Sequence, residues 1–408
     1  MREVVVAGVG MTPFGRHLDR THTDLTRWSV REALADAGIA ASAIDMAVYA
    51  NVTQGFTAGE MSIPAEYALR PLGIAGVRAV HVEAACASAT MGFHLAYDYV
   101  RAGLAEVVLV VGTEKLYSDD PARKLAVFQQ PLDIAEAGRY LVATEGLLAP
   151  VPDGESAAGV NALMDAYAAQ ARLHMATYGT TARQIAAVAA KNHVHSVHNP
   201  LSQYRRPMTI EEVLGARAVA WPLTVPMCAP ISDGSAAAIV CSAEAASRLG
   251  CPAPIRVRAC ASRTGQDRRP DDYANHVTRG VSADAYTAAA IGPVDLDVVE
   301  VHDASSSGEI VQVEALSLCL PGEGGPAAER GTFSIGGRLP VNPSGGLVSK
   351  GHPLGATGLA QIYELVAQLR GTADGRQVAS ARIALAENSG GFYGVEDGMS
   401  CVTILSAD

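Results

Sequence analysis

The sequence has little charge and no long apolar run, and each of these deficits excludes a class of protein. Charged residues make up 18% of the 408-residue chain and hydrophobic residues 49%, which argues against a disordered protein. The net charge of −11 argues against nucleic acid as the main partner. No apolar run reaches the roughly 20 residues that a transmembrane helix needs, so we expect no membrane span.

The seven cysteines lack the spacing of a disulfide scaffold or a zinc site. They stand at positions 86, 228, 241, 251, 260, 319 and 401, and no two of them form a CxxC pair. We therefore expect a reducing compartment and no metal bound by the chain itself. The first apolar run, residues 4–6, is typical of a strand and not of a signal peptide, and residues 406–408 match no peroxisomal signal. These features together predict a cytoplasmic protein.

The order of strand, loop, small-residue helix and buried strand occurs twice along the chain. The first copy consists of a strand at 45–51, a helix after Cys86 and an apolar run at 107–112. The second consists of a strand at 297–302, a helix at 355–369 and a run at 381–386. Apolar strands alternating with helices predict an α/β fold of βαβ units with a largely parallel sheet, in two halves that meet at corresponding loops.

The segment between these halves has a different character. It contains two helical stretches, 159–178 and 181–193, and a capping-box pattern in which Glu212 follows Thr209 by three residues. We predict an inserted domain at 119–228. The first half then comprises 1–118 plus 229–253, and the second half comprises 254–408.

One cysteine and two histidines stand in distinctive local settings. Cys86 lies among small residues where a helix is predicted to begin, and the N–H groups and dipole at a helix start favour a thiolate. His302 ends a predicted buried strand, and His352 lies in a glycine-flanked loop. Taken singly, each also has a structural interpretation, as an inert thiol, a hydrogen-bonded imidazole or a surface residue. Together they indicate covalent acyl transfer, with a cysteine nucleophile and a histidine base.

A glycine-rich turn is predicted at 387–394, after the last apolar run of the second half. Its backbone N–H groups can form an oxyanion site, and a simple tight turn between strands is the alternative.

These motifs in this order resemble the thiolase superfamily, and more specifically the sterol-carrier-protein-type, or lipid-transfer-type, thiolases. The resemblance covers almost the whole chain: the opening at 8–15, the Cys86 segment, 191–193, 199–200, 233–237, 302–303 and 351–353. It implies the thiolase fold, with duplicated βαβ halves in a five-layered α/β/α/β/α core and an inserted loop domain. It also implies coenzyme A or acyl-CoA as substrate, no tightly bound cofactor, and a homodimer or a dimer of dimers.

The resemblance further implies a role for each motif residue. Cys86 carries the acyl group, and His352 activates it. His302 matches the position that helps to bind the thioester oxygen, and the N–H groups of Cys86 and Gly390 match the second oxyanion hole.

The inserted domain would cover the CoA moiety. Its Arg205 and Arg206, together with Lys350, are candidate contacts for the CoA phosphates.

The chain departs from the family where thiolases carry a second cysteine that moves protons. Asn388 and Ala304 occupy the two positions at which that cysteine occurs, and Ser305 replaces a common Phe. The usual base for α-deprotonation is therefore missing, and His302 is the candidate substitute.

Three functions remain open at this point. The first is a CoA-dependent C-acyltransferase that forms or cleaves a β-ketoacyl thioester through acyl-Cys86. The second is a thiolase-like aldolase or lyase, or a decarboxylative ketosynthase-like enzyme, acting with an OB-fold zinc-binding partner, since the 387–391 turn resembles proteins with such a partner. Asn388 and Tyr393 are oxyanion or acid/base candidates there. The third is a non-enzymatic subunit that binds acyl-CoA.

Overall fold

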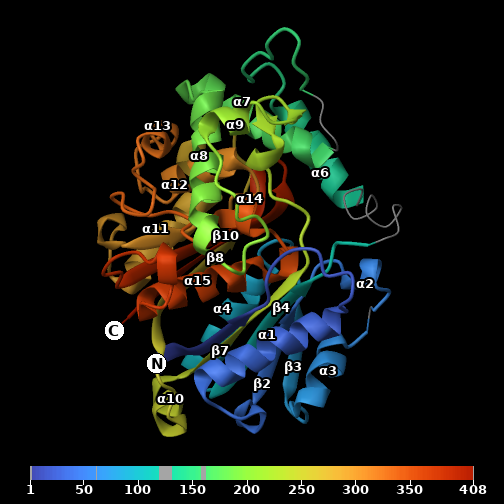
Figure 1. The fold of residues 1–408 in the computed structure, drawn as a ribbon, viewed down its shortest axis with the longest axis vertical. Coiled ribbons are helices and arrows are strands. Elements are labelled where there is room, and N and C mark those ends of the chain that lie inside the picture. Colours follow the sequence, from blue (N-terminus) through green and yellow to red (C-terminus); the bar gives the residue numbers. More distant parts are fainter. Residues whose placement is uncertain (1, 61, 119–130, 158–161, 408) are drawn as a thin grey trace.

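The computed structural model describes residues 2–60, 62–118, 131–157 and 162–407 (Figure 1). Its hydrogen-bonded strands form a nine-stranded sheet in the order β3-β2-β4-β7-β1-β8-β11-β10-β9. The strands of the first half are β1 (Val4–Met11), β2 (Met46–Ala50), β3 (Arg78–Val82), β4 (Val107–Glu114) and β7 (Gly234–Ser242). Those of the second half are β8 (Ile255–Thr264), β9 (Val298–Glu300), β10 (Ile383–Tyr393) and β11 (Glu396–Ser406).

The two halves repeat one pairing pattern. β2 runs parallel to β4, and β9 runs parallel to β10. β7 and β1 then follow antiparallel in the first half, as β11 and β8 do in the second. Val299 of β9 also pairs in parallel with Val341, where the first half has β3. The predicted duplication is therefore present in the sheet topology.

Three large buried clusters hold the layers of the core together. The helix α1 (His22–Ala37) packs with β1, β2, β4 and β7 on the outer side of the first half. The helices α4 (Ser88–Arg101) and α15 (Thr357–Arg370) contact each other and contribute to a central cluster with strands of both halves. The helices α11 (Val277–Ala289) and α12 (Ser306–Ala315) contribute to the outer cluster of the second half. This is the predicted α/β/α/β/α core.

The expectation of a largely parallel sheet is wrong. Among the described strands of the nine-stranded sheet, three pairings are parallel and five are antiparallel. The expectation rested on helices between successive strands, because a parallel pair needs a long crossover connection. β10 and β11 are joined directly through Gly394 and Val395, and so short a connection allows only the antiparallel arrangement.

The segment between β4 and β7 lies over one end of the second half (Figure 1). Its helices are α6 (Pro131–Ala143), α7 (Ala162–Tyr178), α8 (Ala182–His195) and α9 (Ile210–Leu214). The predicted helix at 159–178 corresponds to α7, and residues 159–161 lie outside the described residues. Thr209 forms the predicted capping box with Glu212. Within the described ranges, no helix is both long and apolar enough to cross a bilayer.

Candidate active site

The Cys86 segment is a tight turn that leads directly into α4. Ser88 is the first residue of this helix, so the helix begins just after the cysteine, as predicted. The Ser88 hydroxyl donates to the Ala85 carbonyl at 2.6 Å and accepts from the Ala84 N–H at 2.8 Å, which closes the turn around the cysteine. Ala85 has a φ of 49°, a left-handed conformation that costs free energy for a residue with a Cβ. The turn therefore holds Cys86 in place at the helix start, where it is partly exposed.

His352 lies within hydrogen-bonding distance of the cysteine. Its Nε2 is 3.2 Å from Cys86 Sγ, and its Nδ1 is 2.7 Å from Thr357 Oγ1. The Thr357 hydroxyl donates its proton to the Pro353 carbonyl at 3.0 Å, so its oxygen accepts from the Nδ1–H of the imidazole. The Nε2 lone pair therefore faces the thiol, which is the tautomer that a base for Cys86 requires.

Asn388 connects the other histidine to the cysteine turn. Its Nδ2 donates to the Cys86 carbonyl at 3.0 Å and to Thr90 Oγ1 at 2.9 Å, while its Oδ1 lies 2.9 Å from Nδ1 of His302. A carbonyl can only accept, so the amide cannot be flipped, and Oδ1 must accept from the Nδ1–H of His302. Nε2 of His302 therefore carries no proton and has a free lone pair. His302 and Cys86 line the same cavity.

Both imidazoles are neutral near pH 7. Burial lowers the pKa of His302 to about 4, although its bond to Asn388 acts in the opposite direction. Burial lowers the pKa of His352 well below its usual value, and the neighbouring His302 and Lys350 lower it further. The two rings meet edge to face with centroids 5.2 Å apart. The site thus presents one thiol and two neutral bases.

The main chain of His302 is anchored by a buried acid. Its N–H donates to Glu387 Oε2 at 2.9 Å, and Ser389 Oγ donates to Glu387 Oε1 at 2.7 Å. Burial raises the pKa of Glu387 to about 8, so this carboxyl is protonated at neutral pH.

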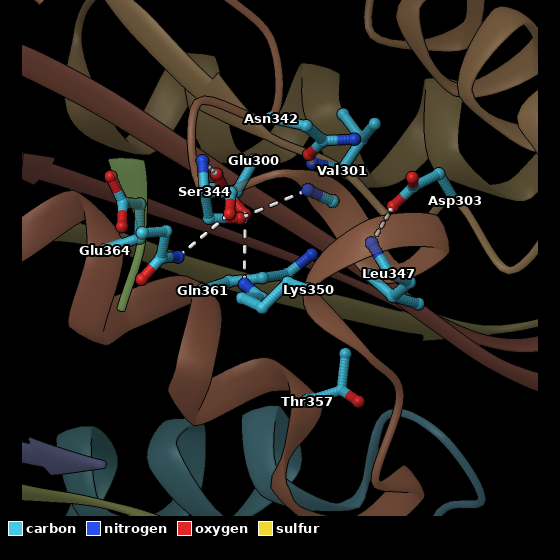
Figure 2. Close-up of polar contacts among 12 residues, drawn as sticks. Glu300, Val301, Asp303, Asn342, Ser344, Leu347, Lys350, Thr357, Gln361 and Glu364 are labelled. Atoms are coloured by element: carbon cyan, nitrogen blue, oxygen red, sulfur yellow. Dashed lines mark hydrogen bonds and ion pairs between the residues drawn. The ribbon is translucent and has the colours of Figure 1, made fainter. Parts of the chain in front are cut away.

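Asp303 and Glu300 tie the two histidine loops together behind the site (Figure 2). Asp303 Oδ1 accepts the Leu347 N–H at 2.6 Å at the start of α14 (Gly346–Lys350), the short helix that precedes His352. Glu300 accepts from Ser344 Oγ at 2.7 Å. The strand that leads to His302 is therefore bonded directly to the segment that carries His352.

Lys350 does not meet the expectation of a contact with CoA phosphate. Its side chain is 1% exposed, and its ammonium group lies 3.4 Å from Glu300 Oε2 (Figure 2). A buried cation neutralised by a buried carboxylate is unavailable to an external anion. The lysine instead supports the loop that carries His352 from behind.

The predicted turn at 387–394 is also wrong, because β10 continues through Tyr393 and only Gly394 and Val395 turn. Glycine is needed at 390 because β10 lies directly against the backbone of the Cys86 turn. A Cβ there would overlap the Ala84 carbonyl oxygen and the Ala87 amide nitrogen. Tyr393 is 53% exposed at the strand end, and its neighbour Phe392 lines the cavity instead. The structure therefore does not bring Tyr393 to the site.

Arg205 and Arg206 are exposed on the surface. They follow directly on Gln203 and Tyr204, whose N–H groups donate to the Lys350 and Ser349 carbonyls at 3.0 Å. The Arg206 guanidinium bonds to Glu212 at 2.7 Å. A role for the two arginines at CoA phosphates stays a prediction.

The site contains residues that the sequence interpretation missed. Thr357 orients His352 and could have been suspected from its place in the same loop. Tyr140 of α6 and Tyr167 of α7 line the cavity. Four polar residues from separate segments also line it: Arg268, His276, Gln312 and Asp397. No local sequence pattern joins such residues, so only the fold reveals them.

The Cys86 thiol and the two histidines also form a set of metal donors. One atom from each lies within 4.8 Å of the others. Zinc accepts thiolate and imidazole ligands, so the thiol can act as a nucleophile only while no metal occupies it. Experiments on the site therefore need a chelator control.

The geometry of a cysteine and two histidines at the junction of duplicated halves defines a thiolase. Family models agree: "Thiolase, N-terminal domain" matches residues 4–221, and "Thiolase C-terminal domain-like" matches residues 259–406. The chain belongs to the thiolase family and is an enzyme of its acyltransferase class. Thiolases act on CoA substrates.

Curated relatives and a solved structure place the chain within this family. It is 36% identical to an acetyl-CoA acetyltransferase of Methanothermobacter thermautotrophicus over 97% of this chain and 98% of that protein. It is 37% identical to rat (Rattus norvegicus) sterol carrier protein 2 over 95% of this chain and 70% of that protein. A structure described as Ltp2-ChsH2(DUF35) aldolase has a TM-score of 0.79 and 26% identity, covering 100% of this chain and 98% of that chain.

Proposed function

We propose that this enzyme is a CoA-dependent C-acyltransferase that forms or cleaves a β-ketoacyl thioester through an acyl-Cys86 intermediate. The observation that carries the proposal is the 3.2 Å contact between Cys86 Sγ and the unprotonated Nε2 of His352. His352 accepts the thiol proton, and the thiolate attacks the thioester carbonyl of acyl-CoA. The new carbon–sulfur bond forms to Cys86, the bond to the CoA sulfur breaks, and His352 returns the proton to the CoA thiolate.

The second step needs a base at the α-carbon of the second substrate. His302 supplies it in this proposal, because Asn388 keeps its proton on Nδ1 and leaves Nε2 free. His302 removes the α-proton, and the resulting carbanion attacks the acyl carbonyl on Cys86. A carbon–carbon bond forms, the bond to Cys86 breaks, and the thiolate recovers the proton. The N–H groups of Cys86 and Gly390 are the proposed oxyanion donors.

A second candidate function is aldol cleavage or formation on a CoA ester, with decarboxylative condensation as a variant. It is favoured by Asn388 and Ala304, which stand at the positions where the family resemblance places the proton-moving cysteine, and by the likeness to an aldolase structure. In the cleavage direction His302 would accept a hydroxyl proton as the hydroxyl carbon becomes a carbonyl and the carbon–carbon bond breaks. The bonding electrons would remain on the α-carbon of the CoA ester as an enolate, to which His302 would return the proton. No acyl group would reach Cys86.

Mass spectrometry after exposure to a panel of acyl-CoAs separates these functions. We expect the acyl mass on the peptide that contains Cys86, with and without EDTA, and its loss in Cys86→Ala. Turnover without any adduct, or full activity of Cys86→Ala, would contradict covalent acyl transfer and favour the aldolase. Dependence on added zinc would indicate a metal site instead.

The segment 119–228 is the proposed cover for the CoA moiety and the acyl group. In support, Tyr140 of α6 and Tyr167 of α7 line the cavity that holds Cys86. Arg205 and Arg206 are the proposed phosphate contacts. The matched test compares Arg205→Gln with Arg183→Gln, an exposed arginine of the same segment that is already paired with two glutamates. Only the first should raise KM for acyl-CoA.

We also propose that the enzyme is a homodimer, paired through β3. This strand ends the sheet, and its five residues are exposed or half-buried, unlike those of the other strands of the first half. An exposed sheet edge offers unpaired N–H and C=O groups to a second copy. Light scattering should give a dimer that Val80→Lys converts to a monomer. A zinc-binding OB-fold partner is a further proposal. The name of the aldolase structure pairs Ltp2 with a DUF35 protein, which supports a partner in general, and addition of the proposed partner should raise turnover.

A further inference from the structure

The cavity that Cys86 and His302 line also contains a second polar cluster. It consists of Arg268, His276, Gln312 and Asp397, which we call the distal cluster because the hydrogen bonds that anchor these four run to residues other than Cys86, His302 and His352. They come from the loop after β8, the N-cap of α11, the helix α12 and the start of β11. None of them takes part in the acyl transfer described above.

The arginine of the distal cluster is not free to bind an anion. Its Nε donates to Glu396 Oε2 at 2.6 Å, and this carboxylate is fully buried. Its Nη1 donates to the Arg269 and Pro270 carbonyls, and its Nη2 donates to the Val395 carbonyl. The guanidinium is therefore neutralised and occupied within the protein.

His276 is occupied within the protein, because its Nδ1 accepts the Thr278 N–H and its Nε2 lies 3.4 Å from Glu396 Oε1. The remaining groups of the distal cluster, Gln312 and Asp397, both offer hydrogen-bond acceptors. The Gln312 Nε2 donates to Asp397 Oδ2 at 3.1 Å, and a flipped amide would set two oxygens face to face. Gln312 Oε1 is then left buried, without a hydrogen-bond partner among the described residues. Gln312 is 5% exposed, whereas the Asp397 side chain is 17% exposed. An unpaired buried acceptor beside a reachable carboxyl group favours a ligand that donates a hydrogen bond.

The charge of the distal cluster narrows the class of ligand. Burial lowers the pKa of His276 to about 4, so its imidazole is neutral near pH 7. With Arg268 and Glu396 cancelling, Asp397 is the remaining acid. Burial raises the pKa of Asp397, and a carboxylate on the acyl group would raise it further, so the distal cluster opposes an acyl group that carries a carboxylate. His276, Glu396 and Asp397 could also be read as metal donors, but Arg268 already occupies Glu396 and repels a cation.

We propose that the distal cluster is a subsite for an uncharged hydroxyl group on the acyl chain. This inference rests on the proposed function in that the acyl chain enters the same cavity as Cys86. The hydroxyl donates to Gln312 Oε1 or Asp397, and a chain that ends in a methyl group leaves these acceptors unpaired. The enzyme therefore selects hydroxylated over plain and carboxylated acyl groups.

Calorimetric binding to the Cys86→Ala variant tests the subsite independently of acyl transfer. The probes are 4-hydroxybutyryl-CoA, pentanoyl-CoA, in which a methyl replaces the hydroxyl, and succinyl-CoA. We expect the hydroxylated probe to bind about tenfold more tightly than pentanoyl-CoA, the size of one good hydrogen bond. Adding Gln312→Met or Asp397→Asn should bring the ratio close to one. Gln266→Met, a change at an exposed glutamine, should leave the ratio as it was.

Several results would overturn the subsite. Equal affinities, a preference for succinyl-CoA, or a preference unchanged by both Gln312→Met and Asp397→Asn would each refute it. Tighter binding that requires zinc and is abolished by EDTA would make the distal cluster a metal site. Since binding is measured without Cys86, a failure of acyl transfer leaves this outcome readable, and the acyl-mass experiment reports on that step alone.

Discussion

Replacing Asn388 by Asp should shift the pH dependence of turnover, because it puts a carboxylate beside His302. Asn388 Oδ1 lies 2.9 Å from Nδ1 of the histidine. Burial lowers the pKa of His302 from 6.5 to about 4. At about 1.4 kcal/mol per pH unit, this difference disfavours the imidazolium by roughly 3 to 4 kcal/mol. A carboxylate at hydrogen-bonding distance raises a neighbouring histidine pKa by about 1–3 units.

The expected result is an acid limb that moves. In the wild type, turnover should stay constant from neutral pH downward and fall only near pH 4, as His302 gains a proton and loses its Nε2 lone pair. In Asn388→Asp the same fall should occur between about pH 5 and 7. The assay is kcat/KM for carbon–carbon bond formation from pH 4 to 9 at constant ionic strength. Acylation of Cys86 is followed in parallel, since it uses His352.

Thr90→Val is the matched control. It removes the second acceptor of the same amide, 2.9 Å from Asn388 Nδ2, and introduces no charge. Its acid limb should stay near pH 4, with a loss of stability of about 1 kcal/mol. A limb in Asn388→Asp that does not move, or one that moves equally in Thr90→Val, would refute the role of Asn388 in setting the protonation of His302.

Three further predictions concern the support of the site. Gly358→Ala places a methyl group against Thr90 Oγ1 and Asn388 Nδ2. The free energy of unfolding measured in urea should therefore fall by about 1–3 kcal/mol, and acylation of Cys86 should slow. An unchanged acylation rate would mean that α4 and α15 can separate without cost. Glu387→Gln removes a carboxyl group whose pKa is raised to about 8 in the folded protein. Between the pKa of the unfolded chain and pH 8, this raised pKa makes the free energy of unfolding of the wild type fall by up to about 1.4 kcal/mol per pH unit. The variant should therefore lose less stability from pH 5 to 8, and an identical slope would contradict the raised pKa. Lys350→Met leaves Glu300 buried without its cation, which should lower the free energy of unfolding by about 3 kcal/mol. The loss should be smaller at pH 5 than at pH 8, because Glu300 can take up a proton. Lys350→Met combined with Glu300→Gln should recover most of the lost stability, and no recovery would show that the lysine acts through packing.

The duplicated α/β architecture and the cysteine with two histidines were predictable from the sequence. The repeat can be recognised in the sequence because each buried strand must be apolar on both faces. In addition, each central helix must carry small side chains to pack between the strands of the two halves. The direction of the strands was not predictable in the same way. It depends on the length of connections such as Gly394–Val395. The glycine-rich sequence at 387–394 predicted a longer turn there, so the short connection was not recognised.

The roles of individual side chains divide along a similar line. Cys86 was identified by its place before a helix, and the structure brings His352 Nε2 to 3.2 Å from it. The predictions for Lys350 and Tyr393 were wrong. Residue type suggests a surface cation for a lysine and an acid/base group for a tyrosine, but only packing decides whether a side chain faces solvent, the core or the cavity. Lys350 faces Glu300, and Tyr393 faces solvent.

The sequence by itself determined which side chains are available for chemistry here, because the presence and order of one thiol and two imidazoles in these motifs are properties of the sequence. Only the tertiary structure decided their protonation and their partners. Asn388 acts on His302 because the main-chain carbonyl of Cys86 fixes its amide, and these three residues are far apart in the chain. The distal cluster arises in the same way, from segments that meet only after the two halves have packed around one cavity.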